Sequence, residues 1–292
     1  MFEQFKSARI EANGVTINLH HGGNGPPLLL LHGYPQTHAI WHSVAGELSR
    51  RFTLVMPDLR GYGDSSKPAG LPDHGNYSKR VMAQDMIEVM RALGFETFYV
   101  CGHDRGARVA HRLALDHPSA VRKLMLIDIS PTRTMYEQTG QAFATFYYHW
   151  FFLIQPYPLP ETLIGANPEY YLRYNLGGWG SEGKKFIAAE AMAEYERCFC
   201  TAEAIHAACE DYRAAATIDL VHDRQDELNK VACPVRVLWG EHGVVARLFH
   251  PLADWQVKCT APVTGKPVAA GHFIPEEAPD VLLAEMNSFF AD

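Results

Sequence analysis

The sequence predicts an α/β protein in which helices flank a mostly parallel β-sheet and a helical segment interrupts the fold. Two observations predict this class. Short apolar runs alternate with amphipathic helical patterns over residues 1–131, and the strand pattern returns after residue 228. Nearly continuous apolar runs fit strands that are buried on both faces of a parallel sheet. Right-handed crossovers would then place the helices on both faces.

The strand and helix expectations follow the chain in order. Strands are expected at residues 27–33, 52–58, 98–104 and 123–130, and again at 233–241 and 266–273. Helices are expected at residues 77–95 and 106–118, with a terminal amphipathic helix at the end of the chain. Each expected strand ends in a turn that carries polar residues, which is where parallel sheets of this kind place their ligands.

Residues 132–228 interrupt the strand pattern with helical segments rich in aromatic residues, such as "FYYHWFF". We therefore expect two domains: a core built from residues 1–131 and 229–292, and a helical cap built from residues 132–228. A cap of this kind would lie as a lid over the carboxyl edge of the sheet.

The composition excludes several function classes. The chain of 292 residues has a net charge of -7, so it has no basic footprint for nucleic acid. The first ten residues are polar and charged, unlike a signal peptide, and no apolar run approaches the length of a membrane span. Six irregularly spaced cysteines favour reduced thiols in a cytoplasmic protein, and no metal-ligand motif such as H-E-x-x-H occurs. We expect a protein without metal or cofactor.

The stretch "GHDRGAR", residues 102–108, carries the chemistry. It follows an expected strand and opens an expected helix, with glycines two residues before and two after Asp104. A sharp strand–turn–helix of this kind exposes the middle residue as a nucleophile in a strained conformation. No serine has this context, which makes a serine esterase improbable. The bland alternative is a glycine-rich turn with an N-capping aspartate.

The partners of such a nucleophile occur at the ends of other expected strands. In "LHGYP", the backbone N–H of Tyr34 could form an oxyanion hole with that of Arg105. Asp128 ends the strand "KLMLIDIS", and His272 follows "KPVAAG". The order nucleophile, acid, histidine is that of the α/β-hydrolases. Glu241 occupies the alternative acid position, and the sequence alone leaves both acids open.

The chain resembles an α/β-hydrolase from end to end, and within that superfamily it most resembles the fluoroacetate dehalogenases. The supporting segments are "HGYPQT", "DLRGYGDSSKP", "GHDRGAR", "YYHWFF", "EDYRA" and "GHF". The resemblance implies that Asp104 displaces a halide from saturated carbon and becomes an ester, which water activated by His272 then hydrolyses. It favours Asp128 over Glu241 as the acid, and it suggests a homodimer that acts on a small haloacid without a cofactor.

Arg105 and Arg108 lie three residues apart in the first turn after the nucleophile, on one face of the expected helix. Positive charge at a helix N-terminus is unfavourable, and a bound anion would offset that cost. Two guanidinium groups suit the carboxylate of an α-halo acid. The alternative is that both arginines pair with acids of the core or cap, or that Arg108 faces solvent. Haloalkane dehalogenases commonly carry a tryptophan where Arg105 stands, so a neutral haloalkane is disfavoured.

Three residues of the expected cap complete the predicted site. His149, Trp150 and Tyr212 each offer an N–H or O–H donor, and the resemblance implies that they bind the halide. Without the resemblance, packed aromatic side chains would be the simpler interpretation. Trp179 is a weaker candidate for lining the same cavity.

Two other functions remain open. An epoxide hydrolase would use the same machinery with two cap tyrosines as acids, and the sequence offers Tyr147, Tyr148, Tyr195 and Tyr212. The arginine pair argues against it, because simple epoxides carry no carboxylate. A non-catalytic ligand receptor on the same fold is the second alternative. Such proteins often lose part of the catalytic set, whereas this sequence retains all of it.

Overall fold

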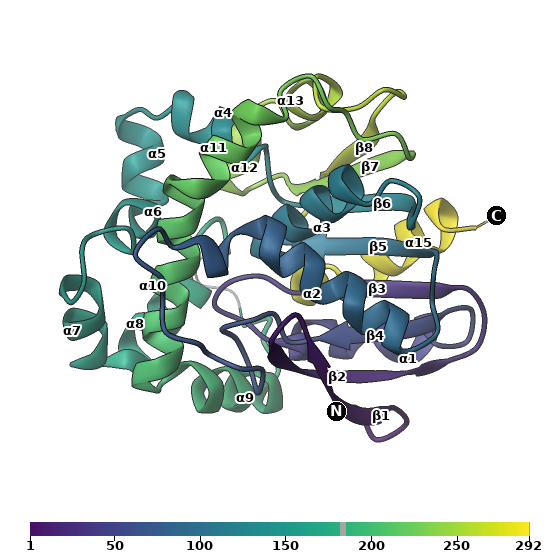
Figure 1. The fold of residues 1–292 in the computed structure, drawn as a ribbon, viewed down its shortest axis with the longest axis horizontal. Coiled ribbons are helices and arrows are strands. Elements are labelled where there is room, and N and C mark those ends of the chain that lie inside the picture. Colours follow the sequence, from purple (N-terminus) through teal and green to yellow (C-terminus); the bar gives the residue numbers. More distant parts are fainter. Residues whose placement is uncertain (182–184, 292) are drawn as a thin grey trace.

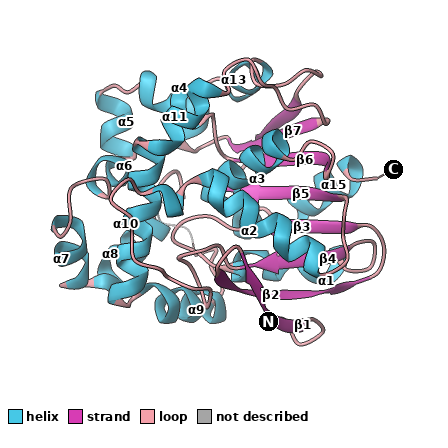
Figure 2. Ribbon diagram, viewed as in Figure 1, coloured by secondary structure: helices cyan, strands magenta, loops and turns pink. Residues whose placement is uncertain are grey.

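The computed structural model of the protein describes residues 1–181 and 185–291. Its centre is an eight-stranded sheet in the order β1-β2-β4-β3-β5-β6-β7-β8, drawn in magenta in Figure 2. The strands are β1 Lys6–Ala12, β2 Val15–Gly23, β3 Pro27–Leu31, β4 Thr53–Pro57, β5 Phe98–His103, β6 Val121–Ile127, β7 Val235–Gly240 and β8 Thr264–Val268. Strand β2 pairs antiparallel with both neighbours, and every other pairing is parallel. The predicted fold class is confirmed.

The hairpin of β1 and β2 was not predicted. The two strands are joined by Asn13 and Gly14, with Ala12 opposite Val15. Both turn residues have positive φ, 49° and 77°, which matches the two-residue turn that Asn-Gly favours between antiparallel strands. The Asn-Gly pair was therefore the available signal. It was missed because β1 is an edge strand with a largely exposed side-chain pattern rather than an apolar run.

Helices cover both faces of the sheet. In Figure 1, α2 (Lys79–Ala92) and α3 (Asp104–Asp116) lie side by side in front of the sheet. The terminal helix α15 (Pro279–Phe289) lies behind it and packs against α1 (His42–Leu48). Strand β5 lies near the middle of the sheet, and all six of its residues are buried. Asp104, the residue that follows β5, is buried as well.

Eight helices lie between β6 and β7 in the described part of the chain, and we refer to them as the helical insertion. They are α4 Thr132–Glu137, α5 Gln141–Phe146, α6 Tyr148–Phe152, α7 Leu159–Gly165, α8 Pro168–Leu176, α9 Ala189–Phe199, α10 Ala202–Ala216 and α11 Ile218–Gln225. Most of them gather at the left of Figure 1, at one end of the sheet. The core continues after the insertion with α12 Val244–Leu248, α13 Pro251–Gln256 and α14 Ile274–Glu277.

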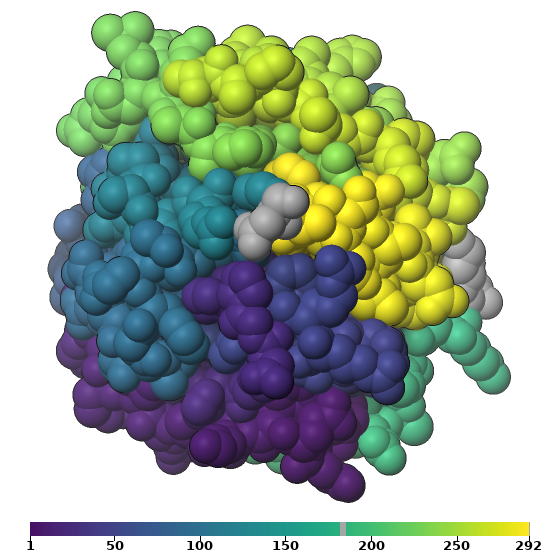
Figure 3. Space-filling view, turned by 90° about the vertical axis from the view of Figure 1, so that its right-hand side faces the viewer, coloured from purple at the N-terminus to yellow at the C-terminus, as the bar shows by residue number. Residues whose placement is uncertain are grey.

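The opposite side of the molecule includes segments from both ends of the chain. In the space-filling view, the purple N-terminal segment and the yellow C-terminal segment lie together on this face (Figure 3). The Arg51 guanidinium donates to the Asn287 side chain of α15 at 3.1 Å. Among the described residues, no helix is both long and apolar enough to cross a membrane.

Candidate active site

Asp104 lies at the turn between β5 and α3, as the glycine spacing predicts. It is the first residue of α3 and has φ 47°, in the left-handed region that non-glycine residues rarely adopt. Two glycines make this turn possible. A Cβ on Gly106 would lie 2.3 Å from the His32 carbonyl oxygen, and one on Gly33 would lie 2.5 Å from the Cβ of Asp104. The close approach of β3, α3 and the loop after β3 therefore requires glycine at both positions.

The loop after β3 brings a backbone donor to the Asp104 carboxylate. The Tyr34 N–H donates to Oδ1 of Asp104 at 3.0 Å. The Arg105 N–H belongs to the first turn of α3, where backbone donors have no partner within the helix. These are the two groups that the sequence predicts for an oxyanion hole. The Tyr34 N–H thus contacts Oδ1, and Oδ2 accepts no hydrogen bond in the described structure.

His272 lies between the two aspartates. Its Nδ1 is 2.5 Å from Oδ2 of Asp128, and its Nε2 is 3.9 Å from Oδ2 of Asp104. Asp128 follows β6, and its Oδ1 accepts a hydrogen bond from the Gly240 N–H at 2.8 Å. Glu241, the alternative acid, is exposed. The geometry thus places Asp128, and not Glu241, against the histidine.

The charges of these three groups depend on one another. Burial opposes a charge on His272, but its hydrogen bond to Asp128 and the nearby carboxylates raise the pKa of the imidazole above its ordinary value. Burial likewise opposes the Asp104 carboxylate, yet the charges of His272, His103 and the two arginines hold the pKa of Asp104 below its ordinary value. Asp104 is therefore ionised at neutral pH, as a nucleophilic carboxylate must be.

Arg105 is held by an acid of the helical insertion. Its Nε donates to Oδ2 of Asp211 at 2.9 Å, and one Nη donates to Oδ1 at 2.7 Å and to the backbone carbonyl at 2.8 Å. The Tyr212 ring lies against the guanidinium, with Cζ 4.2 Å from the ring centroid. The other nitrogen, Nη1, is buried and has no hydrogen-bond partner among the described residues. One edge of the Arg105 guanidinium therefore pairs with an acid, as the alternative interpretation of the sequence expected. Nη1 on the other side remains available to a ligand.

Arg108 has a different environment. Its guanidinium donates to the Ser130 carbonyl at 3.1 Å, the Thr132 hydroxyl at 2.8 Å and the Met135 sulfur at 3.2 Å. Its Cζ lies 4.7 Å from the Trp150 ring centroid. Nε is buried without a partner, and within the described ranges no carboxylate lies at ion-pair distance from this arginine. Arg108 is a buried cation whose charge is not neutralised by a paired acid.

The structure brings the three predicted halide-binding residues together. The ring centroids of His149 and Tyr212 are 5.6 Å apart, and those of Trp150 and Tyr212 are 6.3 Å apart. In each side chain one polar atom is buried and has no partner in the described structure: Nδ1 of His149, Nε1 of Trp150 and the hydroxyl of Tyr212. Burial holds the pKa of His149 well below its ordinary value, so this imidazole is neutral.

Trp179 also belongs to this cluster. Its ring centroid is 4.4 Å from that of His149 and 5.3 Å from that of His272. A buried polar group without a partner is costly in a folded protein, so several in one place indicate a site for a ligand or water. The unpartnered polar atoms of the two arginines and of these insertion residues are therefore candidate contacts for a substrate at Asp104.

The tyrosines considered for epoxide chemistry have separate environments. The hydroxyl of Tyr195 donates to Oε1 of Glu276 at 3.0 Å, and that of Tyr148 donates to the Asn175 side chain at 3.4 Å. The Tyr147 hydroxyl lies 3.4 Å from Nδ1 of His272, on the side of Asp128. Of these four, only Tyr212 has a hydroxyl without a hydrogen-bond partner in the described structure.

Two acids with clear structural roles were not singled out from the sequence. Asp211 holds Arg105, and Glu277 accepts from the N–H groups of Gly271 and Phe273 at 2.9 Å each, on either side of His272. A carboxylate in the alanine-rich stretch "AACEDYRAAA" was a possible signal for Asp211, because charged residues are rarely buried unless they are paired. Glu277 had no comparable signal, since its partners are backbone groups.

Glu276 links the insertion to the core near this site and gives a pH prediction. Its side chain accepts from Tyr195 of α9 at 3.0 Å and from Gln36. Burial raises its pKa from 4.5 to about 8, so the folded state favours the protonated form. This contribution to stability is fully present below the unfolded pKa and is lost as the pH rises towards 8.

We expect the melting temperature of the wild type to fall relative to Glu276→Gln between pH 5 and pH 8, by roughly 3 °C or more, because glutamine imitates the neutral acid at every pH. Thermal unfolding of both proteins across this range checks the prediction. A difference in melting temperature that does not change with pH would contradict it.

The comparisons with known proteins identify the family of the chain. The family model of the α/β hydrolase fold matches residues 26–279. The chain is 44% identical over 292 residues to a fluoroacetate dehalogenase from Burkholderia sp., covering 100% of this chain and 96% of the relative. It is 31% identical to a soluble epoxide hydrolase from Corynebacterium sp. (strain C12), covering 96% and 95%. A crystal structure from Nostoc sp. PCC 7120 with a provisional α/β-hydrolase assignment is 58% identical, with a TM-score of 0.97 and coverage of 100% and 99%.

The chain therefore belongs to the α/β-hydrolase-fold family, in agreement with the resemblance found in the sequence. Relatives that are named as a dehalogenase and as an epoxide hydrolase both align over nearly the whole chain. The class of protein is thus a hydrolase of this fold. Which reaction the protein catalyses depends on which substrate the buried polar side chains near Asp104 bind.

Proposed function

We propose that the protein hydrolyses fluoroacetate, and other small 2-haloacids, to glycolate and halide. The observation that carries this proposal is the pair of buried arginines beside Asp104, each with an unpartnered N–H, because an anionic substrate is what such donors require. The 44% identity to a fluoroacetate dehalogenase over the full chain supports it.

In the first step, Oδ2 of Asp104 attacks the carbon that carries the halogen. The carbon–halogen bond breaks as the carbon–oxygen bond forms, and the halide leaves with the bonding electrons. Arg105 and Arg108 hold the substrate carboxylate, while His149, Trp150 and Tyr212 donate to the halide through the atoms that have no other partner in the described structure. Fluoride needs such donors because a poorly solvated fluoride ion is a poor leaving group.

In the second step, His272 takes a proton from water, and the water oxygen attacks Cγ of the Asp104 ester. Charge develops on Oδ1, which already accepts the Tyr34 N–H at 3.0 Å, and the Arg105 N–H adds a second donor. The intermediate collapses by breaking the bond between Cγ and Oδ2, and Oδ2 leaves on the substrate carbon and takes the proton from His272 to become the glycolate hydroxyl. The water oxygen replaces Oδ2 in the Asp104 carboxyl group, which then releases its remaining proton to solvent. Asp128 orients His272 and stabilises the imidazolium.

The helical insertion would serve as the cap in this mechanism. It supplies His149, Trp150, Tyr212 and Asp211, so the domains that the sequence predicts, residues 1–131 with 229–292 and residues 132–228, would meet at the site. Exclusion of bulk water strengthens every charge interaction inside. A homodimer belongs to the proposal through the resemblance, and a cytoplasmic location through the irregularly spaced cysteines.

Epoxide hydrolysis is the second candidate, and the 31% identity to a soluble epoxide hydrolase favours it. Epoxide hydrolysis requires two tyrosine hydroxyls that can act as acids towards the epoxide oxygen. The hydroxyls of Tyr148 and Tyr195 already donate to Asn175 and Glu276, and the Tyr147 hydroxyl lies near His272. An epoxide would also leave the free N–H groups of both arginines without a partner.

Fluoride release from fluoroacetate, measured with a fluoride-selective electrode alongside glycolate formation, tests the proposal. We expect one glycolate for each fluoride released. If fluoroacetate, chloroacetate and bromoacetate all yield no halide, haloacid hydrolysis is wrong, and diol formation from a panel of small epoxides then becomes the decisive measurement.

A further inference from the structure

Asp211 is a buried acid of the insertion on which three residues of the core converge. Besides Arg105, the Tyr62 hydroxyl donates to its Oδ2 at 2.6 Å, and the Lys79 ammonium contacts its Oδ1. Both Asp211 and Arg105 have an exposed fraction of 0%. Two carboxylate oxygens accept about four hydrogen bonds at most, so these donors saturate the group. Asp211 therefore joins α10 of the insertion to the core through Arg105, the residue that follows the nucleophile.

Asp211 and the next residue hold Arg105 from two directions. The Asp211 carboxylate binds the edge formed by Nε and one Nη, and the Tyr212 ring covers the face of the guanidinium. The guanidinium is planar and its donors have fixed directions, so these contacts also fix where Nη1 points. Nη1 is the nitrogen that has no partner in the described structure.

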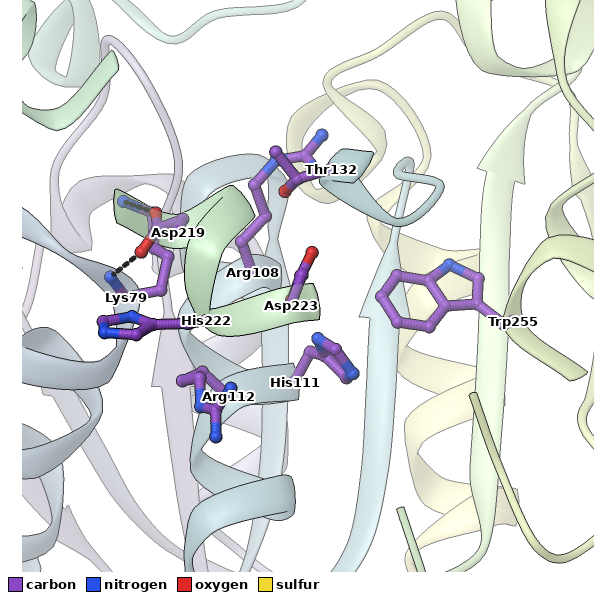
Figure 4. A pocket seen from close by; sticks show the side chains of 9 residues that line it. All are labelled: Lys79, Arg108, His111, Arg112, Thr132, Asp219, His222, Asp223 and Trp255. Carbon is purple, nitrogen blue, oxygen red and sulfur yellow. Dashed lines mark hydrogen bonds and ion pairs between the residues drawn. The ribbon is translucent and has the colours of Figure 1, made fainter. Parts of the chain in front are cut away.

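The network continues away from the site. Lys79 also contacts Asp219 of α11 at 3.7 Å, and the Lys79 N–H donates to the same carboxylate at 2.8 Å. Figure 4 shows Lys79 and Asp219 on the wall of a polar pocket that Arg108 also lines. Arg105, Lys79, Asp211 and Asp219 thus form a chain of alternating charges with no net charge, whereas Arg108 has no paired carboxylate in this part of the described structure.

We propose that Asp211 is a positioning residue that aims Nη1 of Arg105 at the substrate carboxylate, while Arg108 supplies the charge that attracts it. This inference rests on the proposed haloacid hydrolysis, and it assigns different roles to Arg105 and Arg108. Neutralised Arg105 sets the direction of the carboxylate and hence the line of attack by Asp104. Because Asp211 belongs to α10 of the insertion, Arg105 is correctly oriented only when α10 is correctly placed.

Asp211→Asn tests the inference, because it keeps the size of the side chain and removes the second acceptor oxygen. We expect the KM for chloroacetate and the inhibition constant of acetate, a non-reacting carboxylate, each to rise about tenfold or more, since misplaced binding groups commonly cost this much. If Asp211 acted only through its negative charge, both constants should fall instead, because removal of an acid should tighten the binding of an anion. Chloride release in the presence of acetate gives both constants.

Two further variants separate positioning from stability. Asp116→Asn removes an acid that pairs with Arg112 at the far end of α3, and we expect its constants to stay within about twofold of the wild type. Tyr62→Phe removes one donor to Asp211 and keeps every charge, and we expect a smaller rise in the same direction, about two- to fivefold. The melting temperatures of all variants show whether changes in KM and in the inhibition constant merely reflect a loss of stability.

Asp211→Asn with an acetate inhibition constant equal to or lower than that of the wild type would overturn the positioning role and leave haloacid hydrolysis intact. If Asp211→Asn does not fold, unchanged constants in Tyr62→Phe would overturn it equally. A wild-type protein that releases no halide from any haloacid would overturn both the proposed function and this inference. These outcomes distinguish a failure of the positioning role from a failure of the proposed function.

Discussion

Asp104→Asn is expected to abolish halide release, with a loss in kcat of at least about 10⁴-fold, as found when an enzyme loses its nucleophile. The reason lies in the chemistry of the displacement. A neutral amide is a weak nucleophile towards saturated carbon, whereas the Asp104 carboxylate is ionised and lies beside His272, 3.9 Å from Nε2. Fluoride and chloride electrodes measure the loss directly over a long incubation.

The matched control for this prediction lies on the same helix. Asp116 is the last residue of α3, as Asp104 is the first, and Asp116→Asn removes a carboxylate of the same kind away from the turn after β5. We expect the control to retain its activity within about twofold. Halide release by Asp104→Asn at a rate comparable with that of the control would show that another group performs the displacement, and the mechanism would be wrong.

His272→Asn is expected to stop the enzyme after a single turnover, with the ester trapped on Asp104. Displacement of the halide needs only the carboxylate, whereas hydrolysis of the ester needs a base for the water, and His272 is the group between Asp104 and Asp128. One equivalent of halide should appear as a burst, followed by steady-state release at least about 10³-fold slower than in the wild type. Intact-protein mass should increase by one carboxymethyl group.

Peptide mass mapping gives the position of that group. We expect the added mass on the peptide that contains Asp104, and we expect none in Asp104→Asn treated in the same way. A His272→Asn protein that releases no halide and gains no mass under saturating chloroacetate would contradict a covalent intermediate. Sustained turnover without added mass would instead indicate direct attack by water on the substrate carbon.

The sequence by itself determined the framework and the reacting groups. Apolar runs without alternation predicted the parallel strands, because burial on both faces leaves no other pattern, and the confirmed fold follows from it. The glycines around Asp104 located the strained turn, since only glycine permits those backbone approaches. The polar residues at strand ends were predicted to meet because parallel strands end at one edge of a sheet, and Asp128 and His272 do lie within hydrogen-bonding distance.

Only the tertiary structure decided how the charges of the site are paired. From the sequence, Arg105 and Arg108 were equivalent donors three residues apart, yet folding places Asp211 of a distant helix on one and no acid on the other within the described residues. The choice between Asp128 and Glu241 was likewise made by position, because Glu241 stays exposed. Charge pairing depends on contacts between segments far apart in the chain, and neither local spacing nor hydrophobic periodicity records such contacts.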